Sequence, residues 1–114
     1  MEECIFCSIA SGRQPARIVH QDDLVTAFWD IRPVAPTHIL IIPNIHIASM
    51  LSLSPNHQDI LGYMLSIVPA IACDQGLDKN GFRVVINTGP DAGQTVDHLH
   101  LHLIGGRRMS FGFE

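Results

Sequence analysis

Three histidines alternate with leucines in residues 98–104, which read His-Leu-His-Leu-His-Leu-Ile. Successive side chains of a β-strand point to opposite faces of the sheet. The spacing therefore predicts a strand with His98, His100 and His102 on one face and the leucines on the other. Because the leucine face can pack into a core, it fixes the histidine face. Three groups that titrate near neutral pH are thereby held in a row.

Length and charge exclude several classes of protein. The 114 residues fit one compact domain spanning 1–114, and the formal net charge of −4 disfavours a nucleic-acid polymer as partner. We expect no membrane partner, since no apolar run reaches about 18 residues. The acidic start Met1–Glu3 is unlike a secretory signal. Three cysteines argue against a disulfide framework, so we expect a cytoplasmic protein.

The patterns along the chain predict an α+β fold with about five strands in a mostly antiparallel sheet. A short helix is expected over 4–10. One long helix is expected to begin at Ser54 as N-cap and Pro55, to be kinked or divided by Pro69, and to end near Gly76. The stretch 30–37 contains two prolines and is expected to be a loop. Besides the histidine strand, the expected strands cover residues 17–20, 25–29, 38–42 and 82–87.

The histidine row has two chemical interpretations. The three imidazoles can ligate a metal, or the central histidine can act as a nucleophile whose neighbours handle protons. A purely structural role is disfavoured, because each buried imidazole would need a partner. The loop 89–95 is rich in glycine and small polar residues, which is typical of a phosphate cradle, although an ordinary hairpin connection has a similar composition. This loop favours phosphoryl or nucleotidyl transfer.

Several motifs together resemble one family. Residues 98–104 resemble the alternating histidine motif of the histidine triad (HIT) superfamily, and Gly105-Gly106-Arg107 is similar to its histidine triad nucleotide-binding (Hint-like) branch. The segments 4–7, 28–31, 33–43 and 91–96 also fall where this family has its motifs. The resemblance covers nearly the whole chain and implies the HIT fold.

The resemblance implies a role for each of four histidines. His100 would attack the α-phosphorus of a nucleotide and form a covalent nucleotidyl-histidine. His102 would assist proton transfer on the leaving-group side, and His38 matches the family's fourth histidine. His98 would shape the site, with its carbonyl fixing the tautomer of His100. No catalytic cofactor is expected.

The resemblance also implies a purine nucleotide site and a homodimer. Asp30 would bind the ribose, and the phosphate would be held by Asn87, Gly93, Gln94 and Thr95. The base would lie in an apolar slot formed by Phe6, Ile9, Ile18, Phe28 and Ile31. The expected activity is hydrolysis of purine nucleoside phosphoramidates such as adenosine 5′-phosphoramidates. The alternatives are a dinucleoside polyphosphate hydrolase, a non-catalytic nucleotide sensor and a three-histidine metal hydrolase.

A zinc site is implied at one end of the histidine row. Some bacterial members of the family hold zinc at positions that correspond to Cys4, Cys7, His46 and His98. A closed set of four ligands would make the zinc structural. The alternative is that the two cysteines are small buried hydrophobes. The tail 109–114 lacks the Trp-Pro-Pro-Gly ending common in the branch, so the sequence does not identify the leaving group.

Overall fold

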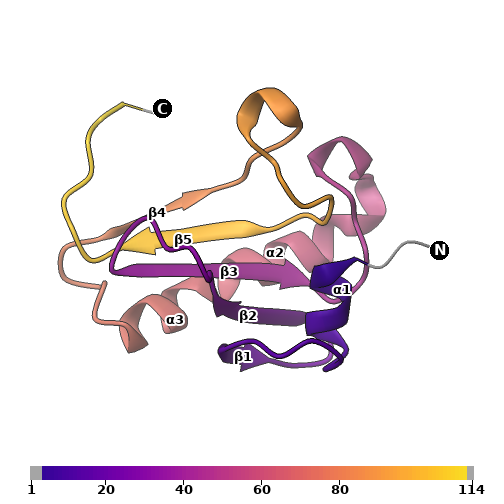
Figure 1. Ribbon diagram of the computed structural model, residues 1–114, viewed down its shortest axis with the longest axis horizontal. Helices are drawn as coiled ribbons and strands as arrows, with labels where there is room; N and C mark the ends of the chain where they lie inside the picture. Colours follow the sequence, from indigo (N-terminus) through magenta and orange to yellow (C-terminus); the bar gives the residue numbers. More distant parts are fainter. Residues whose placement is uncertain (1–3, 113–114) are drawn as a thin grey trace.

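Five antiparallel strands form one sheet in the order β1-β2-β3-β5-β4 (Figure 1). The computed structural model describes residues 4–112. The strand order and its antiparallel pairing confirm the predicted α+β class and the predicted antiparallel sheet. The strands are β1 (Ile18–Gln21), β2 (Val25–Trp29), β3 (Thr37–Pro43), β4 (Phe82–Val85) and β5 (Leu101–Gly105). The helices are α1 (Ile5–Ala10), α2 (Gln58–Ser66) and α3 (Val68–Asp74), with 3-10 turns at Met50–Ser52, Pro55–His57 and Pro90–Ala92.

The central strand β3 organises both layers of the molecule. Every residue of β3 is buried, and the strand pairs with β2 on one side and β5 on the other. Its side chains alternate between two clusters: Ile39 and Ile41 belong to one, and Leu40 and Ile42 to the other. The β-branched composition of the strand suits such a two-sided position.

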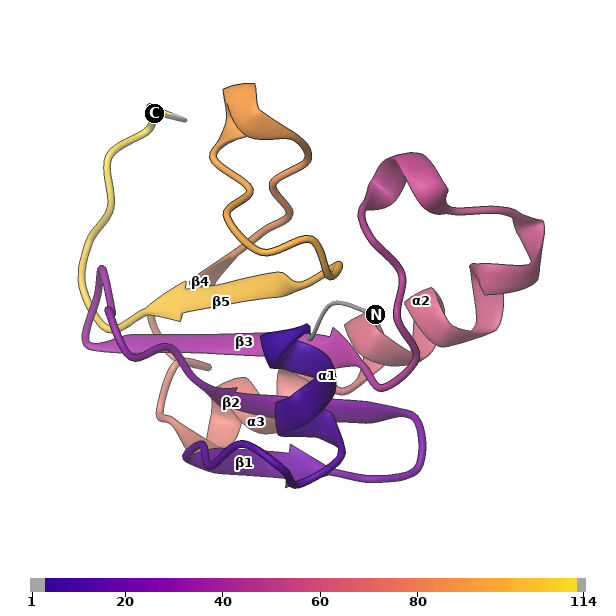
Figure 2. The same ribbon diagram turned by 45° about the vertical axis from the view of Figure 1, so that its right-hand side comes forward.

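The two faces of the sheet are covered unequally. Helices α2 and α3 lie behind the sheet, whereas the short α1 lies across the front of β2 and β3 (Figures 1 and 2). The larger cluster, with Leu101 and Leu103, packs under α2 and α3. The smaller one joins α1 residues Phe6 and Ile9 to the sheet. The part of the front face that α1 does not cover is therefore open to form a functional site.

The long helix, predicted to be either kinked or divided by Pro69, is divided. Helix α2 ends at Ser66 and α3 begins at Val68, with Pro69 in the first turn of α3. Pro69 has no amide hydrogen to donate and cannot continue an unbroken helix. Ser54 caps the 3-10 turn that precedes α2 rather than an α-helix. No helix among residues 4–112 is both long enough and apolar enough to cross a bilayer.

The histidine strand is shorter than predicted. Only residues 101–105 pair as β5, and the stretch 98–100 continues beyond the ladder. The partner β3 ends at Pro43, whose carbonyl accepts a hydrogen bond from the His98 ring instead of from a strand amide. The predicted strand 82–87 likewise ends at Val85. The leucines at 99, 101 and 103 are nevertheless all buried, as the alternation predicts.

Candidate active site

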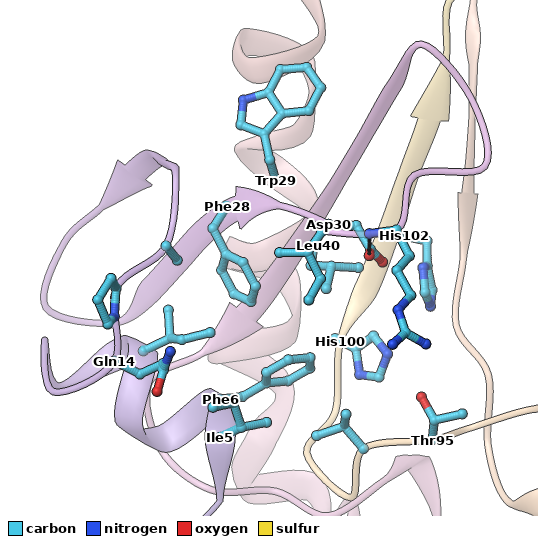
Figure 3. Close-up of a pocket in the computed structure, with 16 residues that line it drawn as sticks. Ile5, Phe6, Gln14, Phe28, Trp29, Asp30, Leu40, Thr95, His100 and His102 are labelled. Carbon is cyan, nitrogen blue, oxygen red and sulfur yellow. Dashed lines mark hydrogen bonds between the residues drawn. The ribbon is translucent and has the colours of Figure 1, made fainter.

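A cavity of about 400 Å³ lies between α1 and the front of the sheet (Figure 3). One part of its wall is polar and contains Asp30, Thr95, His100 and His102. The apolar part is contributed by α1, by the segment that follows it and by the sheet. These apolar residues are Ile5, Phe6, Ile9, Pro15, Ala16, Phe28, Trp29, Ile31, Leu40 and Val96. A mostly apolar cavity with a few converging polar groups is typical of a small-molecule site.

His100 is held in a single tautomer by the main chain. Its Nδ1 lies 2.7 Å from the carbonyl oxygen of His98, and a carbonyl can only accept, so Nδ1 carries the hydrogen. The lone pair is then on Nε2. The ring is buried, contacts the edge of Phe6 and lines the cavity. The neutral form of His100 therefore has its lone pair on Nε2, and this form acts as a nucleophile.

His38 and His102 form a hydrogen-bonded relay. The Val34 amide donates to His38 Nδ1 at 3.1 Å, so the neutral His38 ring carries its hydrogen on Nε2. That nitrogen lies 2.9 Å from His102 Nδ1 and 3.4 Å from an Asp30 carboxylate oxygen. His102 Nδ1 thus accepts, and His102 Nε2 carries a hydrogen. This buried Nε2 has no partner among residues 4–112 and is available to a bound molecule.

Burial keeps the relay neutral. The pKa of His102 is lowered to about 4, mainly by burial and also by the neighbouring His100 and His38 rings, against the opposing effect of the Asp30 carboxylate. Burial also lowers the pKa of His38, although the Asp30 carboxylate raises it. Both rings are uncharged at neutral pH, which the assignment of their tautomers requires. Burial likewise lowers the pKa of His98.

Four potential zinc ligands meet at the other end of the row. One ligand atom from each of Cys4, Cys7, His46 and His98 lies within 4.8 Å of the others. His98 Nδ1 is 3.3 Å from the Cys4 sulfur and 3.5 Å from the Cys7 sulfur, and His46 Nδ1 is 3.4 Å from the Cys7 sulfur. In tetrahedral zinc sites sulfur and nitrogen ligands are about 3.5 Å apart. The donor set and its spacing fit zinc.

The three triad histidines do not form one ligand set within residues 4–112. His98 faces the thiols, while His102 is hydrogen-bonded to His38. A second converging group contains Asp30, His38 and His102, but its two imidazoles are at hydrogen-bonding distance. This arrangement argues against the three-histidine metal hydrolase.

Comparisons with known proteins identify the family. Residues 11–109 match the HIT domain. The chain belongs to the HIT family. It is 50% identical over 108 residues to the purine nucleoside phosphoramidase of Escherichia coli K12, covering 95% of this chain and 91% of that protein. The crystal structure of a HIT family hydrolase from Legionella pneumophila matches with a TM-score of 0.94 and 44% identity, covering 96% of this chain and 97% of that one.

A third relative is a zinc-bound protein. The Zn-bound histidine triad family protein from Mycobacterium smegmatis has a TM-score of 0.81 and 34% identity, covering 96% of this chain and 81% of that one. Both structural neighbours share the HIT fold that the resemblance implies.

The loop before the triad differs in detail from the expected phosphate cradle of the HIT family. The Gln94 side chain is engaged within the protein: its oxygen accepts from the Gly89 amide at 2.9 Å, and its nitrogen donates to the carbonyls of Ala48 and Val96. Gln94 therefore shapes the loop and has no free amide for phosphate, contrary to expectation. Thr95 lines the cavity, whereas Asn87 and Gly93 do not.

Four of the five residues predicted to form the base slot line the cavity, namely Phe6, Ile9, Phe28 and Ile31. Ile18 does not line it and is 43% exposed. Ile18 pairs with Phe28 and so shares its face of the sheet, but it lies on the edge strand β1, which contributes no residue to the lining.

Sequence reasoning missed several lining residues. Leu40 pairs with Phe28 across β2 and β3 and with His102 across β3 and β5, so strand register would have found it. The segment after α1 carries no comparable signal. Among residues 4–112, Arg32 is the one cationic side chain in the lining. The missed residues are Ile5, Gln14, Pro15, Ala16, Trp29, Arg32, Leu40 and Val96.

Proposed function

We propose that this HIT protein is a purine nucleoside phosphoramidase that works through a covalent nucleotide on His100. The observation that carries the proposal is the pair of opposite tautomers on neighbouring rings. His100 offers a lone pair on Nε2, His102 offers a hydrogen on Nε2, and the two ring centres are 4.8 Å apart. A nucleophile beside a proton donor is the combination that cleavage of a phosphorus–nitrogen bond requires.

The tautomers define a two-step reaction. His100 Nε2 attacks the α-phosphorus, and the phosphorus–nitrogen bond breaks with its electron pair on the departing amine. His102 Nε2 supplies the proton that makes this amine neutral, and the negative charge left on the His102 ring is offset by the positive charge of the nucleotidyl-His100 ring, 4.8 Å away between centres, until the second step returns a proton. In the second step water attacks the nucleotidyl-histidine, its proton passes to His102, and the nucleoside monophosphate leaves His100. Both steps are displacements at phosphorus in which positioning supplies most of the catalysis.

The cavity suits a purine nucleotide in one orientation. We place the base against the apolar wall with Phe6, Ile9 and Phe28, and the ribose hydroxyls beside Asp30. The phosphate then lies between Thr95 and the two histidines. The lining of the cavity and the E. coli phosphoramidase relative support this orientation.

We further propose that the thiol cluster holds a structural zinc. Zinc would link Cys4 and Cys7, at the start of α1, to His46 and to His98 beside β3, and four protein ligands leave no position for a substrate. The His98 Nε2 hydrogen donates to the Pro43 carbonyl at 2.8 Å, as the second nitrogen of a metal-ligating histidine commonly does. The Zn-bound relative supports the assignment.

The proposed assembly is a homodimer of single-domain chains in the cytoplasm. A wholly apolar groove of about 210 Å³ lies between α2, the stretch that precedes α2, and the residues around the start of β5, and Ile86, just after β4, also lines it. Strand β4 is at the edge of the sheet. An apolar groove beside a free strand edge suits a second copy of the chain. Cys4, Cys7 and Cys73 all lie within residues 4–112 and none of them is in a disulfide, which suits a reducing compartment.

The decisive experiment uses the lysine adduct of adenosine 5′-phosphoramidate. We expect turnover by the wild type and a loss of at least about 10³-fold in His100→Ala, since the nucleophile is removed. His57→Asn is the matched control, because His57 lies outside the cavity. Mass spectrometry of acid-quenched protein should find the nucleotide on His100.

The same assay separates the alternatives. Faster turnover of a dinucleoside polyphosphate would assign the polyphosphate hydrolase, and tight binding without turnover would assign a sensor. Loss of activity on brief chelation, with the fold intact, would favour metal catalysis. The proposal fails if wild type is inert on every phosphoramidate or if His100→Ala keeps its full rate.

A further inference from the structure

Arg107 binds the loop that sets the tautomer of His38. Its Nη2 donates to the Val34 carbonyl at 3.1 Å, and its Nη1 donates to the Arg108 carbonyl at 3.2 Å. The amide of the same Val34 donates to His38 Nδ1 at 3.1 Å. The Arg107 guanidinium therefore binds the carbonyl of Val34, while the amide of Val34 binds the first histidine of the relay, His38.

Close backbone packing brings Arg107 to this loop. Gly106 has φ +96°, and a Cβ there would lie 2.9 Å from the Cβ of Pro36. The chain after β5 thus lies directly against the loop that carries Val34, and only glycine fits at the contact. Arg107 follows this contact immediately.

Little else fixes Val34. Its side chain is 59% exposed, so packing does not hold the residue in place. A charge-assisted hydrogen bond to a main-chain carbonyl is one of the stronger restraints on an exposed loop. The position of the Val34 amide therefore depends on the guanidinium.

We propose that Arg107 is a positioning residue for proton transfer: it holds Val34 so that His38 keeps its hydrogen on Nε2 and His102 keeps its own on Nε2. Without this restraint His38 gains access to the opposite tautomer, with the hydrogen on Nδ1. His38 Nε2 then accepts, His102 Nδ1 has to donate, and His102 Nε2 loses the hydrogen that the departing amine needs. Asp30, 3.4 Å from His38 Nε2, favours the original tautomer, so we expect a partial loss.

The kinetic test compares two leaving groups and rests on the proposed function. One substrate is an adenosine 5′-phosphoramidate of an alkylamine, which needs a proton to leave. The other is adenosine 5′-(4-nitrophenyl phosphate), whose phenolate leaves without one. In Arg107→Met we expect kcat to fall by roughly 10-fold on the alkylamine substrate, with KM unchanged and little change on the ester. Arg107→Lys should recover part of the rate.

The matched control is Arg108→Met, which removes a neighbouring exposed arginine of the same tail. It should leave both substrates unaffected. The proposal would be overturned if Arg107→Met lowered kcat equally on both substrates, because a general disturbance of the tail affects both leaving groups alike. It would also be overturned if Arg108→Met lowered kcat on the alkylamine substrate as much as Arg107→Met does.

A second measurement needs no substrate. Long-range proton–nitrogen NMR correlations of the histidine rings report which nitrogen carries the hydrogen. We expect Nε2 hydrogens on His38 and His102 in the wild type, and a shift of His38 toward the Nδ1 form in Arg107→Met but not in Arg108→Met. Unchanged tautomers in Arg107→Met would overturn the proposal. If the wild type cleaved neither substrate, the proposed function would fail while this measurement still decided the role of Arg107.

Discussion

His98 and His102 stand at the two ends of one row but have opposite chemistry. The His98 Nε2 hydrogen donates to the Pro43 carbonyl, so its Nδ1 lone pair faces the thiols of Cys4 and Cys7. His102 instead accepts on Nδ1 from His38 and keeps a hydrogen on Nε2. The first ring is suited to ligate a metal, and the second is suited to donate a proton. The difference teaches that the partner of the second ring nitrogen decides the role of a histidine.

The largest expected effects come from substituting the two end histidines of the row, His98 and His102, one at a time. His102→Asn should lower kcat on an alkylamine phosphoramidate by about 10²- to 10⁴-fold, the usual contribution of a general acid, and should leave zinc content unchanged. His98→Asn should lose zinc and lower the melting temperature. Steady-state kinetics, metal analysis and calorimetry on both variants measure this. If either variant lost both zinc and the general-acid contribution, the division of the row would be wrong.

Cys4→Ser tests the thiol end with less disturbance of the histidines. We expect zinc content to fall and the melting temperature to drop by several degrees, because a ligand of a structural zinc supports the fold. The remaining folded protein should turn over phosphoramidate within a few-fold of wild type. Cys73→Ser is the matched control, since Cys73 is exposed and lies outside the cluster. Unchanged zinc content and melting temperature in Cys4→Ser would remove the zinc site.

The smallest effect is a pH dependence of stability. The folded protein holds His102 at a pKa of about 4, below the ordinary value of 6.5, so the unfolded chain binds the proton more tightly. Stability should therefore be complete above pH 6.5 and decrease as the pH falls toward 4. Burial of His38 acts in the same direction. Urea titrations from pH 7 to pH 4 measure the effect, and His102→Asn should flatten part of the slope. An equal slope in that variant would contradict the assignment.

The sequence predicts the site well where strand alternation governs it. The burial of Leu99, Leu101 and Leu103 follows from a period of two, and so does the opposite orientation of the histidines. Ile18 pairs with Phe28 and so shares its face of the sheet, but it belongs to the edge strand β1, and the strand residues that line the cavity come from β2, β3 and β5. How far the cavity extends across the sheet leaves no mark in the residue pattern.

Loop contacts are the second limit of sequence reasoning. Gln94 is predicted as a phosphate ligand, yet its amide joins Gly89 to Ala48 and Val96. The Arg107 contact with Val34 joins residues far apart in the chain through a main-chain carbonyl. Main-chain groups are the same in every residue, so the sequence carries no signal of which one a side chain will bind.

The nucleophile owes its tautomer to a main-chain carbonyl, that of His98. Every amino acid supplies such a carbonyl, whereas only a few side chains can join the thiol cluster beside it. In the proposed site the side chain of residue 98 binds zinc while its carbonyl orients His100, so selection can act on the side chain without changing the carbonyl. A lineage of this fold that lost its cysteines would be free to change the side chain at 98 and still keep the geometry of His100.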